Sequence, residues 1–195
     1  MLNVLYDTLE KLGFHLEKAN SERGTLIALS SGSPVRRMRI ACEGSNTSSR
    51  SIIRIFPDVM DEPGMQTAKV LLDEIQKKLG ADPERTVLGG FSQGAMLSCD
   101  ALLHSTQPYA GLIQLSGTLV AKQEWAPLLT KRKGLPLFQS HGTQDPILPY
   151  AMAERLRDEF LQAGVSVDWQ PFRGGHEIPE PVLRKLGSFL LKAVR

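Results

Sequence analysis

The chain has 195 residues, which is long enough for one domain with a substantial hydrophobic core. Its composition, 42% hydrophobic and 23% charged, is ordinary for a folded protein, and a net charge of +2 argues against a nucleic-acid partner. Because no apolar run approaches the length of a transmembrane helix, we expect no stable membrane insertion.

The cysteines and the first residues indicate the compartment. Cys42 and Cys99 lie far apart and form neither a disulfide framework nor a Cys-x-x-Cys motif, which favours a reducing environment. The start of the chain lacks the basic segment of a signal peptide and soon includes Asp7. We therefore expect a cytoplasmic protein, and the sequence leaves open whether it forms a homodimer.

The first 55 residues have an irregular pattern. Leucines spaced along residues 2–13 predict a helix, and short apolar runs at 26–29, 38–42 and 51–56 predict strands. Residues 33–54 contain five arginines and one acidic residue. A solvated basic face is the favoured interpretation of this segment, and a partner-binding surface is the alternative.

From Ile52 onward, predicted strands and helices alternate. The pattern predicts a mainly parallel sheet with helices on both faces, and we expect one domain with a divergent part at 1–55 and a core at 56–195. Residues 122–133, which include Trp125, are predicted to form a surface segment. The predicted strands of the core span 86–88, 110–115, 135–140 and 165–171, and its predicted helices span 68–79, 93–104, 149–163 and 180–194.

One turn of the core has the pattern of a nucleophile. Ser92 stands in Gly90-Phe91-Ser92-Gln93-Gly94, between a predicted buried strand and a predicted buried helix. A sharp strand-to-helix turn needs small residues two positions before and after the serine, and it presents the hydroxyl above the sheet. The N–H of Gln93 then points at the same space, at the positive end of the helix.

Two further side chains follow later strands and complete a Ser-Asp-His order. Asp145 comes after the strand at 135–140, and His176 comes after the strand at 165–171. The carboxyl ends of parallel strands meet at one edge of a sheet, so we expect both residues near Ser92. A serine needs such a base, and the base needs a carboxylate to orient it.

Other polar residues are assigned structural roles. His141 is expected to shape the turn before Asp145, and His104 to cap the helix that follows Ser92. Ser116 also ends a strand but lacks flanking glycines at the required spacing. No grouping has metal-ligand spacing, and we expect neither a metal nor a cofactor.

Residues 56–195 resemble the phospholipase/carboxylesterase family, which includes acyl-protein thioesterases and bacterial carboxylesterases. The resemblance rests on Gly90-Phe91-Ser92-Gln93-Gly94, on His141-Gly142 followed by Asp145-Pro146, and on Gly174-Gly175-His176. It implies an α/β-hydrolase fold without a lid domain, with Ser92 as nucleophile, Asp145 as acid and His176 as base. It also implies small acyl esters or thioesters as substrates.

The sequence departs from this family in its first third. The family has an early His-Gly-x-Gly type loop that supplies one of two oxyanion-hole N–H groups, and this chain has no such motif. The nearest counterpart is the strand and turn at 26–34, which makes the backbone N–H of Ser31 the expected second donor beside Gln93. Apolar residues at the strand ends are candidates to contact an acyl chain: Met96, Leu119, Ile147, Leu148 and Ile178.

The sequence therefore predicts a serine hydrolase that cleaves ester or thioester bonds through an acyl-enzyme. The missing loop and the basic segment at 36–39 support an alternative, a weak or inactive hydrolase fold that acts as a binding module. A third hypothesis, that the chain is a fragment, predicts poor folding of the isolated chain.

Overall fold

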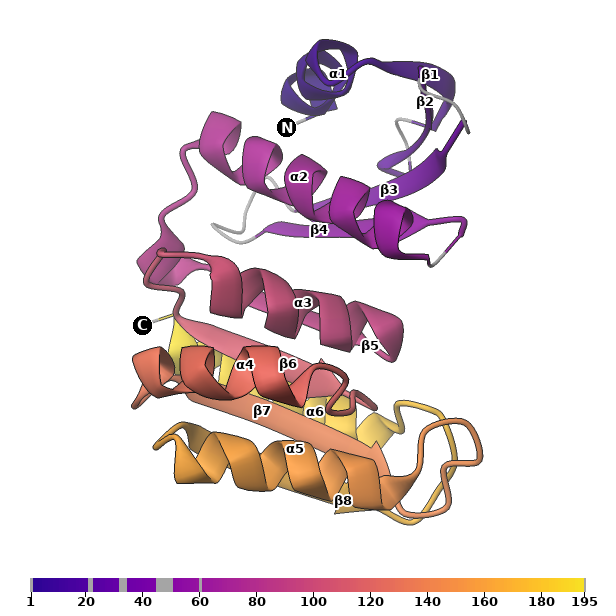
Figure 1. The fold of residues 1–195 in the computed structure, drawn as a ribbon. Helices are drawn as coiled ribbons and strands as arrows, with labels where there is room; N and C mark the ends of the chain where they lie inside the picture. The colour runs from indigo at the N-terminus through magenta and orange to yellow at the C-terminus, as the bar shows by residue number, and fades with distance from the viewer. Residues whose placement is uncertain (1, 21–22, 32–34, 45–50, 60, 195) are drawn as a thin grey trace. The chain divides into compact units, whose positions relative to one another are not determined.

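The structure is a computed structural model that describes residues 2–20, 23–31, 35–44, 51–59 and 61–194. Its contacts divide the chain into two compact units, Met1–Ala81 and Asp82–Arg195 (Figure 1). The boundary between these units lies later than the change of pattern at residue 55, because the helix α2 (Glu62–Leu79) packs with the first unit. No helix in the described ranges combines the length and hydrophobicity needed to cross a membrane.

The first unit is an antiparallel sheet of four strands with two helices. The strand order is β1-β2-β3-β4, and α2 packs against α1 and β4. Asp61 caps α2 by accepting a hydrogen bond from the Gly64 N–H at 2.8 Å. The remaining elements of this unit are α1 (Leu2–Lys11), β1 (Phe14–Asn20), β2 (Thr25–Ser30), β3 (Arg37–Gly44) and β4 (Ser51–Pro57).

Two sequence predictions for this unit were wrong. The strand β1 was not predicted, because its side chains after Phe14 are exposed and lack an apolar alternation. The strand at 51–56 was predicted to begin the alternation of a parallel sheet, but β4 pairs antiparallel with β3, with Ile55 opposite Ile40. Too few residues separate β3 from β4 for the crossover that parallel pairing requires.

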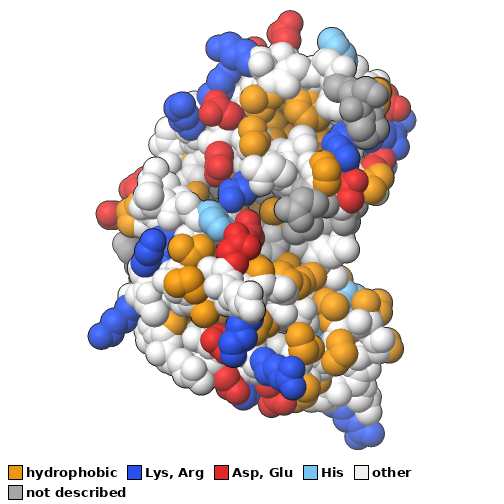
Figure 2. All heavy atoms as spheres, viewed as in Figure 1, with side chains coloured by type: hydrophobic (Ala, Val, Ile, Leu, Met, Phe, Trp, Pro, Cys, Tyr) orange, Lys and Arg blue, Asp and Glu red, His pale blue; other side chains and the backbone are white. Residues whose placement is uncertain are grey.

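Arginines in the first unit are paired with acidic side chains of neighbouring segments. Arg36 lies 2.6 Å from Asp61, and Arg37 lies 2.6 Å from Glu17. Arg54 pairs with a glutamate on β3 in the same way. On the face seen in Figure 2, side chains of both charges are interspersed. These pairs favour the solvated-face interpretation of the basic segment over a binding surface that needs free positive charge.

The second unit is the predicted parallel sheet. Its strand order is β5-β6-β7-β8, and each strand pairs parallel with the next. The elements are η1 (Pro83–Arg85), β5 (Val87–Phe91), α3 (Gln93–His104), β6 (Gly111–Leu115), α4 (Lys122–Leu129), η2 (Thr130–Arg132), β7 (Pro136–Gly142), α5 (Tyr150–Gln162), β8 (Ser166–Phe172) and α6 (Glu180–Ala193). Figure 1 shows α3, α4 and α5 on one face of this sheet and α6 on the other.

Alternation along the central strands explains the two helical layers. Phe138 on β7 and Leu115 on β6 are buried against Phe189 of α6. The intervening residues face the opposite layer, where Gln114 donates to the Ala95 carbonyl of α3 at 2.6 Å and Gln139 donates to a carbonyl of α5. A sheet covered on both faces is the arrangement that parallel strands require.

The segment around Trp125 is largely exposed, as predicted, but the tryptophan itself is buried. The Trp125 side chain is only 1% exposed, and its indole N–H donates to Asp100 of α3 at 3.1 Å. The segment forms a helix, α4, that was not predicted because polar residues surround Trp125. This helix buries its apolar side against α3.

We expect Phe138→Ala to lower the free energy of unfolding by about 3–5 kcal/mol, because it empties a fully buried site between the sheet and α6. Urea denaturation measures this loss. The matched control is Leu191→Ala on α6, where the side chain is 46% exposed and the change should stay within about 0.5 kcal/mol. Equal losses in the two variants would contradict the assigned core.

Candidate active site

Ser92 lies at a sharp turn between β5 and α3. Its backbone angles are φ 57° and ψ −123°, in a region that side-chain-bearing residues rarely adopt. The Ser92 N–H donates to the Leu115 carbonyl at 2.8 Å, and the Ser92 carbonyl accepts from the Ala95 N–H at 3.0 Å. The β6 strand and the first turn of α3 therefore hold the serine in this conformation, with a partly exposed side chain.

Gly90 and Gly94 contribute differently to this turn. A Cβ atom on Gly90 would lie 2.2 Å from the backbone of Gly94, whereas a Cβ on Gly94 would meet no atom within 4 Å. In this structure the requirement for a small residue therefore applies to Gly90, two positions before Ser92, and not to Gly94. The close approach of Gly90 to Gly94 brings the start of α3 onto the end of β5.

Gln93 is the first residue of α3. The first N–H groups of a helix have no earlier carbonyl of their own helix to bond, and the helix dipole places partial positive charge there. The N–H of Gln93 therefore stands beside Ser92 at the end of the helix that favours an anion.

Asp145 lies in the turn that follows β7, with its carboxylate buried. One carboxylate oxygen, Oδ1, accepts from the N–H groups of Ile147 at 2.8 Å and Leu148 at 2.9 Å. The other, Oδ2, lies 2.7 Å from Nδ1 of His176. The structure thus brings together the Asp and His residues that the sequence singled out, from segments that follow neighbouring strands.

Hydrogen bonding keeps Asp145 ionised despite its burial. Burial raises the pKa of Asp145, but hydrogen bonds to the carboxylate outweigh burial and hold the pKa below its ordinary value. The donors, in order of their effect, are the Leu148 N–H, the His176 ring and the Ile147 N–H. A buried carboxylate that stays anionic can orient an imidazole and stabilise its protonated form.

Backbone hydrogen bonds join the loops that carry Asp145 and His176. Thr143 N–H donates to the Phe172 carbonyl at 2.8 Å, and Gln144 N–H donates to the Gly174 carbonyl at 2.9 Å. A Cβ on Gly142 would lie 2.2 Å from the Gly175 carbonyl oxygen. Only a glycine at 142 permits this approach, so the Asp–His distance depends on it.

His176 also approaches the serine turn. Its ring centroid lies 4.7 Å from that of Phe91, the residue directly before Ser92. In the described part of the chain, the Ser92 hydroxyl and the His176 ring do not form a hydrogen bond; the partners of His176 are Asp145 and Phe91. Bonds of this kind are often long in a protein without substrate and tighten when substrate binds.

His141 belongs to the same cluster, although its place in the sequence predicted only a role in shaping the turn. Its side chain is fully buried, Nε2 lies 2.9 Å from the Leu148 carbonyl oxygen, and the same nitrogen lies 3.3 Å from Oδ2 of Asp145. The signal in the sequence was its position at the end of a buried strand, four residues before Asp145.

Ser31 lies in the first unit, directly after β2. Its N–H donates to the Gly13 carbonyl at 2.8 Å, and its hydroxyl lies 3.1 Å from Nε2 of His15. In this structure the Ser31 N–H is therefore engaged within its own unit, which differs from the expectation that it is an oxyanion donor.

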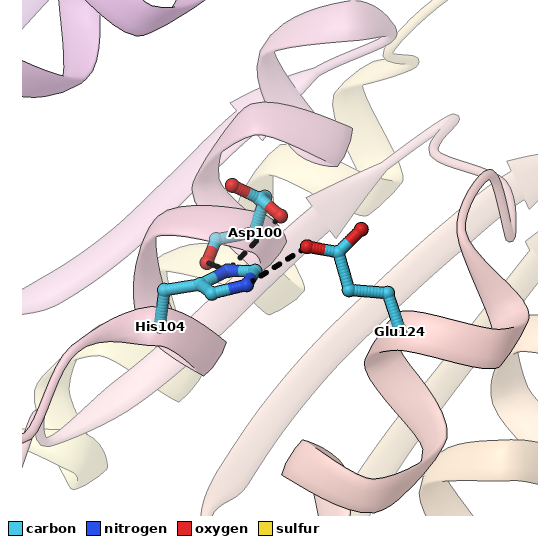
Figure 3. A group of neighbouring side chains, drawn as sticks. All are labelled: Asp100, His104 and Glu124. Carbon is cyan, nitrogen blue, oxygen red and sulfur yellow. Dashed lines mark hydrogen bonds and ion pairs between the residues drawn. The ribbon is translucent and has the colours of Figure 1, made fainter.

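Figure 3 shows Asp100, His104 and Glu124, the group within the described residues whose His and carboxylate atoms lie within 4.8 Å of one another. Nδ1 of His104 lies 3.1 Å from Asp100, and Nε2 lies 3.0 Å from Glu124. Because the carboxylates face opposite nitrogens, the three do not converge on one ion. The histidine instead links α3 to α4, and it also bonds the Asp100 carbonyl at the end of α3.

The cysteines do not compete with Ser92 as nucleophiles. Both are free thiols, and Cys99 is fully buried within α3. Burial raises the pKa of both thiols, so neither supplies a thiolate at neutral pH.

We expect Gly90→Ala to destabilise the second unit by about 1–3 kcal/mol or more, because its Cβ overlaps the Gly94 backbone. Gly94→Ala is the matched control; it has open space and should leave stability unchanged or raise it by up to about 1 kcal/mol. Urea denaturation of both variants checks this. A larger loss in Gly94→Ala would contradict the described turn.

The ionised Asp145 should stabilise the fold in a pH-dependent way. Since its pKa in the folded chain is lowered, the contribution is complete above the unfolded-state pKa of about 3.9 and is lost as pH falls further through the folded-state value. The difference in unfolding free energy between wild type and Asp145→Asn should therefore shrink below about pH 4. A difference that is constant through this range would show that the carboxylate is not held in its charged form.

Comparison with known proteins identifies the family of this chain. The phospholipase/carboxylesterase family matches residues 60–194. Acyl-protein thioesterase 1 of Neurospora crassa is 33% identical over 137 residues, which cover 67% of this chain and 56% of that protein. The Kluyveromyces lactis protein of the same name is 32% identical over 149 residues, covering 71% of this chain and 65% of that protein.

A solved structure shows the same fold. The Bacillus cereus carboxylesterase superposes with a TM-score of 0.61 at 22% identity, covering 75% of this chain and 77% of that one. The chain spans between half and two-thirds of the length of the curated relatives that it matches first. With an α/β-hydrolase fold and a family match from residue 60 to residue 194, the chain belongs to the phospholipase/carboxylesterase family.

Proposed function

We propose that this protein is a serine hydrolase that cleaves carboxylic ester or thioester bonds through an acyl-enzyme. The observation that carries the proposal is the 2.7 Å contact between His176 Nδ1 and the buried Asp145, beside a serine held at φ 57°. Family membership and the acyl-protein thioesterase relatives support the same class of reaction. The relatives are named as thioesterases, and the family description names carboxylesterases, so the proposal includes both thioester and ester bonds.

The roles of the three residues follow from their hydrogen bonding. With its Nδ1 proton directed at Asp145, the neutral His176 ring presents a bare Nε2 that can accept the Ser92 proton. The serine oxygen attacks the acyl carbonyl, and the Gln93 N–H stabilises the oxyanion that forms. His176 then protonates the leaving alcohol or thiol, which departs from the acyl-enzyme. A water molecule, deprotonated by His176, releases the acid and restores Ser92.

The proposal assigns one oxyanion donor, Gln93. Removing one of two donors from such a site typically lowers kcat by about a hundredfold to a thousandfold. We therefore expect turnover below that of an enzyme with two donors.

Among the apolar candidates for contact with an acyl chain, Ile147 is 64% exposed directly after Asp145-Pro146, whereas Met96 and Leu119 are buried in the core. Ile147 is accordingly the side chain we propose to contact an acyl chain.

The test is hydrolysis of a short-chain p-nitrophenyl ester and of an acyl thioester by wild type and Ser92→Ala. We expect Ser92→Ala to lower kcat by about 10⁴-fold or more, because the nucleophile is lost. The matched control is Ser116→Ala, another serine at a strand end with a positive φ of 50°, which should retain activity. Equal rates in wild type and Ser92→Ala would overturn the assignment of the nucleophile.

A fluorophosphonate probe separates the possible failures. Labelling at Ser92 without turnover would mean that the Ser-His pair works but the oxyanion is poorly stabilised. A chain that folds yet neither labels nor turns over would overturn the proposal and favour the alternative hypothesis of a binding module. Loss of labelling in Ser116→Ala but not in Ser92→Ala would show that the probe reacts with Ser116, and the assignment of Ser92 as nucleophile would be wrong.

A further inference from the structure

His141 is a second buried imidazole in contact with Asp145, and the mechanism proposed above does not use it. Its Nε2 lies 2.9 Å from the Leu148 carbonyl oxygen and 3.3 Å from the same Asp145 oxygen that binds His176. Two histidines from different segments therefore converge on Oδ2 of one carboxylate. The Asp145 side chain is fully buried in both contacts.

The chemistry of these neighbours determines where the His141 proton lies. A backbone carbonyl and an ionised carboxylate only accept hydrogen bonds, so Nε2 must carry the hydrogen. Within the described residues, Nδ1 of His141 is buried and has no hydrogen-bond partner. A proton there would have no acceptor, so the environment favours the neutral ring with a bare Nδ1.

A neutral donor suits this position better than a charged one. An arginine or lysine at the same place would neutralise the carboxylate, and His176 would then lose the negative charge that stabilises its protonated form. The neutral His141 ring supplies an N–H without supplying a charge. The Tyr150 ring, 6.2 Å away between centroids, packs beside it at the start of α5.

The Leu148 contact strengthens the same constraint. Leu148 donates its N–H to Oδ1 of Asp145 and offers its carbonyl to His141. His141 therefore restrains the carboxylate through the backbone of the turn that binds Oδ1, and its Nε2 also lies close to Oδ2. Rotation of the Asp145 carboxylate would break contacts at both oxygens.

We propose that His141 is a positioning residue: as a neutral hydrogen-bond donor to the Leu148 carbonyl, it holds the turn that orients the Asp145 carboxylate toward His176. It acts through Asp145 and does not contact the substrate. This inference rests on the proposed function for its kinetic consequences, but its geometry stands independently of turnover.

The first test compares two substitutions of equal length. His141→Gln keeps an N–H donor near the position of Nε2, whereas His141→Met has similar volume and no donor. We expect His141→Met to lower kcat roughly tenfold to a hundredfold with KM nearly unchanged, and His141→Gln to keep kcat within about threefold of wild type. Thermal unfolding of both variants normalises for folded protein. Equal kcat values in the Met and Gln variants would overturn the proposal.

The second test needs no enzymatic activity. The His176 ring proton that bonds Asp145 should give a low-field proton resonance in wild type and in His141→Gln, and this resonance should shift or broaden in His141→Met. Nitrogen-15 shifts of wild-type His141 should show a protonated Nε2 and a bare Nδ1. Protonation at Nδ1 would overturn the proposal even if the Met variant failed to fold.

The two tests also separate this inference from the proposed function. If wild type and Ser92→Ala were equally inactive while the ring resonance responded as expected, the proposed function would fail and the positioning role would hold. If wild type were active and the Met variant kept both its kcat and its resonance, the reverse would follow.

Discussion

The candidate site depends on the hydrogen bond between the buried Asp145 carboxylate and His176. A carboxylate without solvent is costly to ionise, and here backbone N–H groups of Ile147 and Leu148 offset that cost at one oxygen while His176 engages the other. This bond exists because the loops after β7 and β8 approach closely at Gly142. The parallel register of those strands places both loops at one edge of the sheet.

The serine turn is built by a second close approach, between Gly90 and Gly94. It sets α3 directly on the end of β5 and aims the helix N-terminus at the space beside Ser92. The sheet supports this turn from behind, because Ser92 bonds the end of β6 and Gln114 anchors the first turn of α3. Backbone strain at Ser92 is therefore held by contacts from three elements, as is common where a reactive group is presented.

The two units have different chemistry. The unit Asp82–Arg195 carries the Ser, Asp and His residues and the parallel sheet, and the family match includes all of it except Arg195. The unit Met1–Ala81 has an antiparallel sheet in which Arg36, Arg37 and Arg54 are matched by acidic partners, and its Ser31 N–H is engaged by Gly13. The proposed chemistry thus draws on residues of the second unit.

Much of the second unit was predictable from local pattern. Alternating strands and helices indicated the parallel sheet, and the positions of Ser92, Asp145 and His176 after predicted strands indicated one edge of that sheet. Both inferences use only the period of the hydrophobic residues and the order of elements along the chain. The first unit was predicted poorly: β1 has exposed side chains without alternation, and the prediction for 51–56 followed the alternation of strands and helices rather than the short connection that makes β4 pair antiparallel with β3. Trp125 was also misplaced, since its burial requires α3 as a neighbour.

By itself, the sequence determined which residue types follow which strands, and so which three residues are candidates for the chemistry. Tertiary structure alone decided how they are held. The overlap that a side chain at Gly90 would make with Gly94, the approach of His141 and His176 to one Asp145 oxygen, and the engagement of Ser31 by Gly13 are all set by how the backbone folds in three dimensions. Such contacts depend on interatomic distances of a few ångströms, which spacing along one chain does not specify.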